Sequence, residues 1–237
     1  YSKNSEINDF NSKNLSDYFS AIVSYQNQDN QSALEFLSRS GVGSIGIVDN
    51  DKVSLSNLHR QSLYLTKDIG KFKVKIAKDK IKNINPNTKI KTYKIRLNNI
   101  NFRKIINDYD YIVDGSDNFK TKFLLNDVCL KFKKTLITGA ISKFDGHIFT
   151  FNFKNKNIPC LRCFYQESEI SDDLLNCESE GILGSVAGIT GTFQANEVLK
   201  KILNIGENID GYIFILDLLN LNFRKVKIKK SKNCFCK

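Results

Sequence analysis

The sequence is poor in several features, and each shortage removes a class of function. No apolar run approaches the roughly 18 residues that a membrane-spanning helix needs, so we expect no membrane partner. Only two of the 237 residues are histidines, His59 and His147, and neither is assigned an acid–base role. The first residue is Tyr1 rather than methionine, so we interpret the N-terminus as truncated.

Glycine is missing where a nucleotide-binding fold most needs it. The chain has 13 glycines, but none precedes Gly41. The first strand-to-helix turn of a dinucleotide-binding unit is glycine-rich because the backbone there approaches the phosphates closely. Here the apolar residues 21–23 lead into a polar segment, residues 24–30, that contains Tyr25, Gln26 and Asp29. An NAD-binding oxidoreductase is therefore a poor interpretation.

The chain carries a positive charge of +11, from 36 basic and 25 acidic residues. Such an excess raises nucleic acid as a possible partner. The lysines, however, are spread along the chain and are not gathered with aromatic side chains into a stacking platform. We therefore expect no direct nucleic-acid binding.

Apolar strand-like runs alternate with helical patterns through the first 140 residues. This alternation predicts an α/β fold with a mostly parallel sheet covered by helices on both faces. The last third changes to the alternating pattern of antiparallel strands. With 41% hydrophobic residues the chain can bury one core, and we predict a single domain over 1–237. The predicted strands are 20–23, 43–48, 88–93, 109–113, 135–138, 146–153, 212–216 and 222–228, and the predicted helices are 32–40, 71–84, 100–107 and 118–132.

Two close cysteine pairs stand far apart in the sequence. Cys160 and Cys163 are separated by two residues, and Cys234 and Cys236 by one. Four thiolates can bind one Zn²⁺ tetrahedrally, so we predict a structural zinc site, although the second pair is more closely spaced than is typical. Buried thiols without a metal are the alternative. Disulfides are the weaker one in a chain of this length with thinly spread cysteines.

Polar residues that suit a nucleoside triphosphate follow the predicted strands. Asp49 ends the second strand, where an acidic side chain commonly accepts hydrogen bonds from ribose hydroxyls. Arg60 and Lys73 would place cations beside phosphates, and Asp114 or Asp117 would hold Mg²⁺. The aspartate and asparagine after a strand are also typical of a helix cap.

Taken in order, these segments resemble the MoeB/ThiF family of ubiquitin-activating-type adenylyltransferases over nearly the whole chain. The resemblance lies in residues 41–49 (GVGSIGIVD), 56–61 (SNLHRQ), 70–74 (GKFKV), 114–118 (DGSDN), 138–140 (TGA), 159–163 (PCLRC), 176–181 (NCESEG) and 188–195 (GITGTFQA). It implies a Rossmann-like sheet, with a nucleotide-binding part over about 1–140 and a zinc-bearing, carrier-binding part over about 141–237.

The resemblance also implies an activity and a set of partners. The family uses Mg-ATP to adenylate the C-terminal glycine of a ubiquitin-like or sulfur-carrier protein, and a homodimer in the cytoplasm or an organelle is expected. By motif, Asp49 would bind the ribose, Asn57, Arg60 and Lys73 the phosphates, and Asp114 or Asp117, with the neighbouring Asn118, the magnesium.

Cys177 matches the place of a cysteine that forms a transient thioester or persulfide with the activated carrier in sulfur-transferring members. We therefore predict Arg60, Asp117 and Cys177 as the catalytic residues. The missing glycines leave a second interpretation open, in which the chain is a non-catalytic member that docks a carrier or an active partner subunit.

Overall fold

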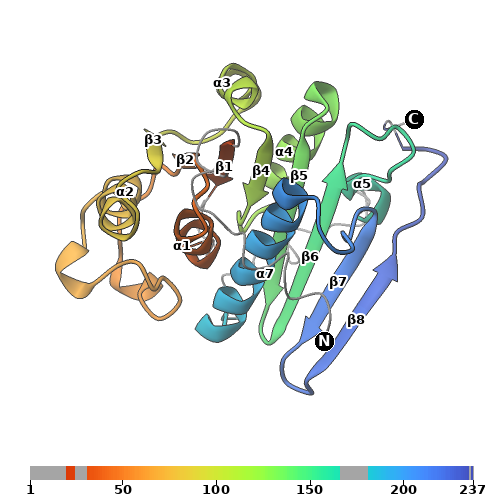
Figure 1. Ribbon diagram of the computed structural model, residues 1–237. Helices are drawn as coiled ribbons and strands as arrows, with labels where there is room; N and C mark the ends of the chain where they lie inside the picture. The colour runs from red at the N-terminus through yellow and green to blue at the C-terminus, as the bar shows by residue number, and fades with distance from the viewer. Residues whose placement is uncertain (1–19, 25–30, 166–180, 235, 237) are drawn as a thin grey trace, which may run out of the picture.

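The computed structural model describes residues 20–24, 31–165, 181–234 and 236, in which eight strands form one sheet (Figure 1). The strand order is β3-β2-β1-β4-β5-β6-β7-β8. The first five strands in this order pair in parallel, and β6 to β8 continue the sheet with antiparallel pairings. The strands are β1 (Ser20–Ser24), β2 (Ser44–Val48), β3 (Lys89–Tyr93), β4 (Tyr111–Asp114), β5 (Thr135–Ser142), β6 (Asp145–Asn152), β7 (Tyr212–Asp217) and β8 (Asn222–Lys227).

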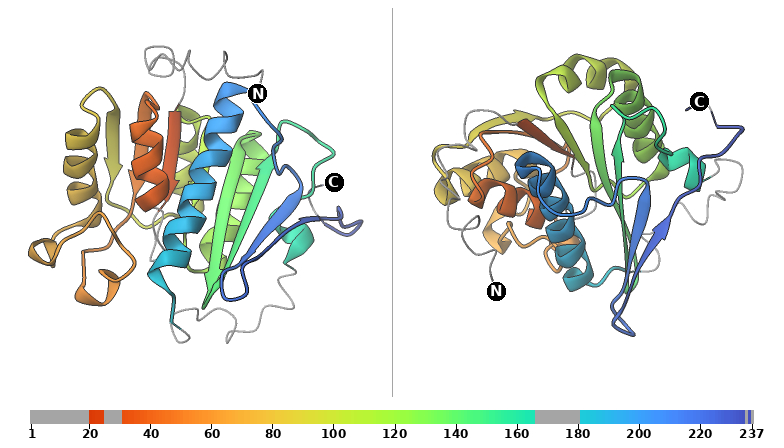
Figure 2. Two further views of the ribbon diagram at one scale, coloured as in Figure 1. Left: turned by 60° about the horizontal axis from the view of Figure 1, so that its bottom comes forward. Right: turned by 45° about the vertical axis from the view of Figure 1, so that its right-hand side comes forward.

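Helices cover both faces of the sheet, as the turned views make plain (Figure 2). Helices α1, α2 and α7 lie on one face, and α3 and α4 lie on the other (Figures 1 and 2). Their bounds are α1 (Gln31–Arg39), α2 (Lys73–Ile84), α3 (Asn99–Ile105), α4 (Phe119–Phe132), α5 (Leu161–Phe164) and α7 (Gly184–Leu203), with short 3-10 turns at Leu55–Asn57, Thr66–Asp68 and Ile106–Asp108. None of these helices is both long and apolar enough to cross a membrane.

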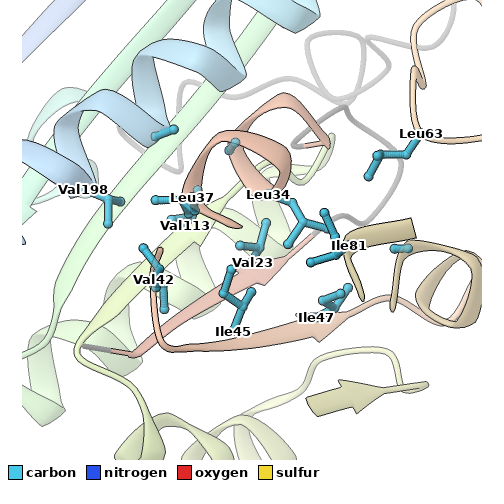
Figure 3. Close-up of a cluster of buried hydrophobic side chains, with 14 of the residues drawn as sticks. Val23, Leu34, Leu37, Val42, Ile45, Ile47, Leu63, Ile81, Val113 and Val198 are labelled. Atoms are coloured by element: carbon cyan, nitrogen blue, oxygen red, sulfur yellow. The ribbon is translucent and has the colours of Figure 1, made fainter. Parts of the chain in front are cut away.

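The strands bury side chains toward both helical layers because successive residues of a strand point to opposite faces. Val113 packs under α1 and α7, whereas its neighbour Ile112 packs under α3 and α4. Figure 3 shows the first of these two cores, where Val23 and Ile45 of the sheet meet Leu34 and Leu37 of α1. Two apolar layers therefore cover the faces of the sheet and leave the ends of the strands for a ligand.

The predicted α/β fold is confirmed, but the predicted helices did not include α5 and α7, and the remaining differences concern element bounds. Strand β5 continues to Ser142 instead of ending at Thr138, because β6 pairs with it along its whole length. Helix α2 begins at Lys73 rather than Lys71, because Phe72 forms an isolated bridge with Lys52 that keeps the chain extended there. The division of the chain into one domain with two parts stays a prediction.

Candidate active site

The strand order changes direction at β1, and this creates a crevice. From β1 the chain passes to β2 on one side, and it later returns to β4 on the other. Ser24, at the end of β1, lies in register with Val48 of β2 and Asp114 of β4. In open parallel sheets, ligands bind outside the carboxyl ends of the strands at such a switch point. The loop that follows β1, residues 25–30, lies outside the described residues.

Asp49, which follows β2, is fully buried at this edge. Its Oδ1 accepts a hydrogen bond of 2.7 Å from the Asp51 amide, while its Oδ2 has no partner among the described residues. Burial raises the pKa of Asp49 to about 6, and the positive charge of Lys73 only partly offsets this. A buried carboxylate oxygen without a donor is costly, so Asp49 suits a ligand hydroxyl that would donate to it.

Lys73 is the first residue of α2, and its side chain is almost wholly buried. Its Nζ lies 3.6 Å from Asp51 Oδ2, which is a long ion pair. The charge of Lys73 lowers the pKa of Asp49 and the charge of Asp117 raises it. The ammonium of Lys73 is therefore held in place by the fold and supplies positive charge at the crevice.

The raised pKa of Asp49 predicts a pH-dependent cost to stability. Between pH 3.8 and about 6 the folded carboxyl binds more protons than the unfolded one, so the free energy of unfolding falls as pH rises through this window. The full cost, about 3 kcal/mol above pH 6, should be removed in Asp49→Asn. We expect this variant to be about 1–3 kcal/mol more stable at pH 7.5, but close to the unmodified protein at pH 4, in urea unfolding.

The exposed Asp79→Asn serves as the control for that experiment, because Asp79 lies on the solvent side of α2. An equal stability change for Asp49→Asn at both pH values would contradict the assignment of the raised pKa to Asp49.

The loop after β2 brings two further predicted residues to this end of the sheet. Asn57 lies in a 3-10 turn, and Arg60 follows with its Nη1 3.3 Å from the carbonyl oxygen of Ser56. The first residue of α7, Gly184, packs directly on this loop, since a Cβ there would lie 2.2 Å from the His59 carbonyl oxygen. The start of α7 therefore fixes the backbone from which Arg60 projects.

Asp114 and Asp117 are both candidate metal ligands by sequence, but they differ in burial and in their hydrogen bonds. Asp114 is buried, and both its oxygens already have partners in the protein. Asp117 is only half-buried, and its Oδ1 accepts a 3.1 Å hydrogen bond from Asn118 Nδ2. Asn118 also caps α4 through Oδ1, which accepts from the Thr121 amide at 2.8 Å. Of the two aspartates, Asp117 is better placed to meet a metal ion.

Two polar residues of this site were given no role from the sequence. Lys122 lies on the buried side of α4 and contacts Asp114. Gln194 of α7 donates from Nε2 to the Asp114 carbonyl oxygen at 2.8 Å and to the Ile137 carbonyl oxygen at 3.3 Å. The sequence signal for Lys122 and Gln194 is a polar side chain on the apolar face of a helix. This signal indicates a site residue only once the buried face of the helix is known.

A cavity of about 1040 Å³ borders the site at Asn118. Its wall combines apolar side chains, among them Leu97, Phe119 and Leu124, with the amides of Asn98 and Asn118 at the starts of α3 and α4. Four charged residues also line it: Arg96, Lys120, Asp127 and Arg162. Apolar surface with a few polar groups is typical of a pocket for a flat heterocyclic ring.

The four cysteines predicted from their spacing come together at one place. Their sulfur atoms all lie within 4.8 Å of one another, and the C-terminal residues return beside α5 to complete the group (Figure 1). Cys160 Sγ lies 3.5 Å from Cys234 Sγ and 4.0 Å from Cys163 Sγ, and Cys163 Sγ lies 3.5 Å from Cys236 Sγ. Four sulfurs bound tetrahedrally at 2.3 Å would be about 3.8 Å apart. The separations therefore fit a zinc site.

Burial raises the pKa of the Cys160 thiol well above its usual range and that of Cys236 to about 12. Buried thiols of this kind ionise only when a cation compensates them. The cluster is attached to α4, because Leu161 N donates to Asn126 Oδ1 at 2.9 Å and Arg162 makes two 2.9 Å contacts with Asp127.

Of the three predicted catalytic residues, Arg60 and Asp117 are described above, and Cys177 lies outside the described residues.

The fold and this site define the chain as a Rossmann-like protein with a polar, charged crevice at the switch point of its sheet. The ThiF family matches residues 31–237, and the chain belongs to this family. It is 41% identical over 202 residues to a probable molybdopterin-synthase adenylyltransferase of Gracilaria tenuistipitata var. liui, covering 85% of this chain and 56% of that protein.

One further relative and one solved structure are similar to the chain. The chain is 35% identical over 204 residues to a sulfur carrier protein adenylyltransferase of Thermus thermophilus, which covers 85% of this chain and 75% of that protein. The crystal structure of E. coli MccB with succinimide has a TM-score of 0.81 at 18% identity, covering 95% of this chain and 68% of that one. This last similarity concerns the fold alone.

Proposed function

We propose that the protein catalyses ATP-dependent adenylation of the C-terminal glycine of a ubiquitin-like or sulfur-carrier protein. The observation that carries the proposal is the buried Asp49 carboxylate at the switch point of a ThiF-family sheet, whose Oδ2 has no partner among the described residues. The relatives named as adenylyltransferases support it.

The reaction needs alignment and charge more than a protein nucleophile. An oxygen of the carrier's terminal carboxylate would attack the α-phosphorus of ATP, and the bond from that phosphorus to the bridging oxygen would break to release pyrophosphate. Lys73 and Arg60, with Asn57, would bind the phosphates and neutralise the leaving charge. Asp49 Oδ2 would accept from a ribose hydroxyl, and the cavity beside Asn118 would take the base.

A divalent cation would supply charge neutralisation between the phosphates, and oxygen ligands are those that Mg²⁺ prefers. Asp117 would be its protein ligand, because the oxygens of Asp114 are already engaged. Asn118 would serve this ligand indirectly, by donating to Asp117 Oδ1.

For the cysteine cluster we propose one structural Zn²⁺ held by Cys160, Cys163, Cys234 and Cys236. A site closed by four thiolates leaves no open position, so the metal would stabilise the fold and take no part in the reaction. The contacts from α5 to Asn126 and Asp127 mean that the metal would fasten the C-terminal residues to α4.

Cys177 would pass the activated carrier onward: its thiolate would attack the carbonyl carbon of the acyl-adenylate, form a thioester and release AMP. We expect a thiol-sensitive adduct with the carrier, seen on non-reducing gels, to disappear in Cys177→Ala while pyrophosphate exchange persists, because adenylation needs no thiol. The matched control is Cys129→Ala, whose thiol is buried inside α4. An adduct that survives in Cys177→Ala would contradict the assignment.

The second candidate function is a non-catalytic family member that docks a carrier or an active partner subunit. The absence of glycine before Gly41 favours it, because side chains there would meet the phosphates. A homodimer and a cytoplasmic or organellar location remain predictions for either function.

Calorimetry with Mg-ATP, followed by pyrophosphate exchange with candidate ubiquitin-like carriers, separates the two functions. Micromolar binding with carrier-dependent exchange is the result expected for the enzyme. A folded protein that binds no nucleotide would instead be a docking relative.

A further inference from the structure

Three side chains form a buried polar cluster beneath the loop that carries Asp117. Lys122 Nζ lies 3.1 Å from Asp114 Oδ2, with the two side chains 5% and 0% exposed. Thr138 Oγ1 donates to the same Asp114 oxygen at 2.5 Å, and Lys122 also donates to the Gly139 carbonyl oxygen. The cluster thus joins α4 to the end of β4 and to the middle of β5.

Stability alone does not account for these groups. Removing two charges from water costs several kcal/mol, and a buried ion pair is often no more stabilising than apolar side chains of similar volume. Leucine or methionine at position 122 would satisfy the apolar side of α4. A buried polar cluster of this kind can instead fix the geometry of the segments that it joins.

The hydrogen bonds of the cluster and its neighbours fix the backbone of the four residues after β4, residues 115–118. Asp114 Oδ1 accepts from the Ser116 amide at 2.9 Å, which fixes the turn just before Asp117. Gln194 holds the Asp114 carbonyl oxygen from the other face of the sheet. On the far side of Asp117, Asn118 is fixed as the cap of α4. Both neighbours of Asp117 are therefore anchored, while its own carboxylate stays half-exposed.

We propose that Asp114, Lys122 and Thr138 are positioning residues that hold this loop so that Asp117 meets the divalent cation of the bound nucleotide. The proposal rests on the proposed adenylation and adds to it. Asp114 thereby acts through Asp117 and not as a metal ligand. Groups that orient a metal ligand typically contribute about 10–100-fold to metal affinity.

The test compares Lys122→Met and Thr138→Val with two matched variants. Thr138→Ser keeps the hydroxyl, and Lys131→Met removes an exposed lysine of the same helix. For each protein, ATP affinity is measured by calorimetry with Mg²⁺ and with a chelator. The ratio of the two affinities is the magnesium-dependent gain in ATP affinity. Hydrogen exchange of residues 115–118 is measured without any ligand.

We expect Lys122→Met and Thr138→Val to lose about 10-fold or more of the magnesium-dependent gain, while metal-free ATP binding changes by less than about 2-fold. The amides of residues 115–118 should exchange faster in both, and Thr138→Ser and Lys131→Met should behave like the unmodified protein. If Lys122→Met fails to fold, the result for Thr138→Val alone tests the positioning role, because valine matches threonine in shape within a strand.

An unchanged magnesium-dependent gain in Thr138→Val and in folded Lys122→Met would overturn the positioning role and leave the adenylation proposal intact. An unmodified protein without magnesium-dependent ATP binding would contradict the adenylation proposal itself, and the positioning role with it.

Discussion

Asp117→Ala is expected to lower carrier-dependent pyrophosphate exchange at least about 100-fold, since it removes the carboxylate proposed to hold the magnesium ion. The half-buried Asp117 contributes little to packing, and its hydrogen bond from Asn118 is a partly buried contact between sequence neighbours. The free energy of unfolding should therefore change by less than about 1 kcal/mol. Exchange of labelled pyrophosphate into ATP, at saturating carrier and varied Mg²⁺, measures the effect.

The control for this variant is Asp79→Ala, which removes an exposed carboxylate from α2 and should leave the rate unchanged. Asp114→Ala provides a contrast. It should also lose activity, but it leaves the Lys122 ammonium buried without its carboxylate, which costs about 3–5 kcal/mol of stability. Near-normal exchange in Asp117→Ala would remove Asp117 from the magnesium site.

Cys160→Ala is expected to reduce the zinc content of the purified protein from about one ion per chain to nearly none. Cys160 is fully buried within the four-sulfur group, so its loss leaves three ligands and a cavity in the core. Because metal binding free energy is also folding free energy, Tm should fall by roughly 10 °C. Elemental analysis by mass spectrometry and thermal unfolding of the same preparation check both results.

Cys129→Ala is the matched control, because it removes a buried thiol of α4 that lies outside the cluster. It should keep its zinc, whatever its effect on stability. A metal-free preparation of the unmodified protein that stays folded with the same Tm would contradict the structural role proposed for the metal.

Much of the fold follows from local patterns. Helix α4 was predicted at residues 118–132 and spans Phe119–Phe132, because Asn118 is both a good cap and the end of the polar loop. Strand β4 was predicted to begin at Tyr109 but begins at Tyr111. Tyr109 instead closes the preceding 3-10 turn, and its ring packs beside Gly46, where no Cβ could fit. That contact joins residues 63 positions apart, which no local pattern encodes.

The sequence by itself determined the chemistry present in this protein. Spacing predicts that the four cysteines form one group, and the motifs shared with the ThiF family predict Asp49, Lys73 and Asp117 as site residues, because spacing and residue type are local properties of the chain. The tertiary structure alone decided how these groups differ. The sequence does not distinguish Asp114 from Asp117, because both are aspartates of the same motif. Only the packing of α4 against β5 brings Lys122 and Thr138 within hydrogen-bond distance of Asp114. The pKa of Asp49 likewise depends on burial and on the charges of Lys73 and Asp117, which two other segments bring close only in the folded chain.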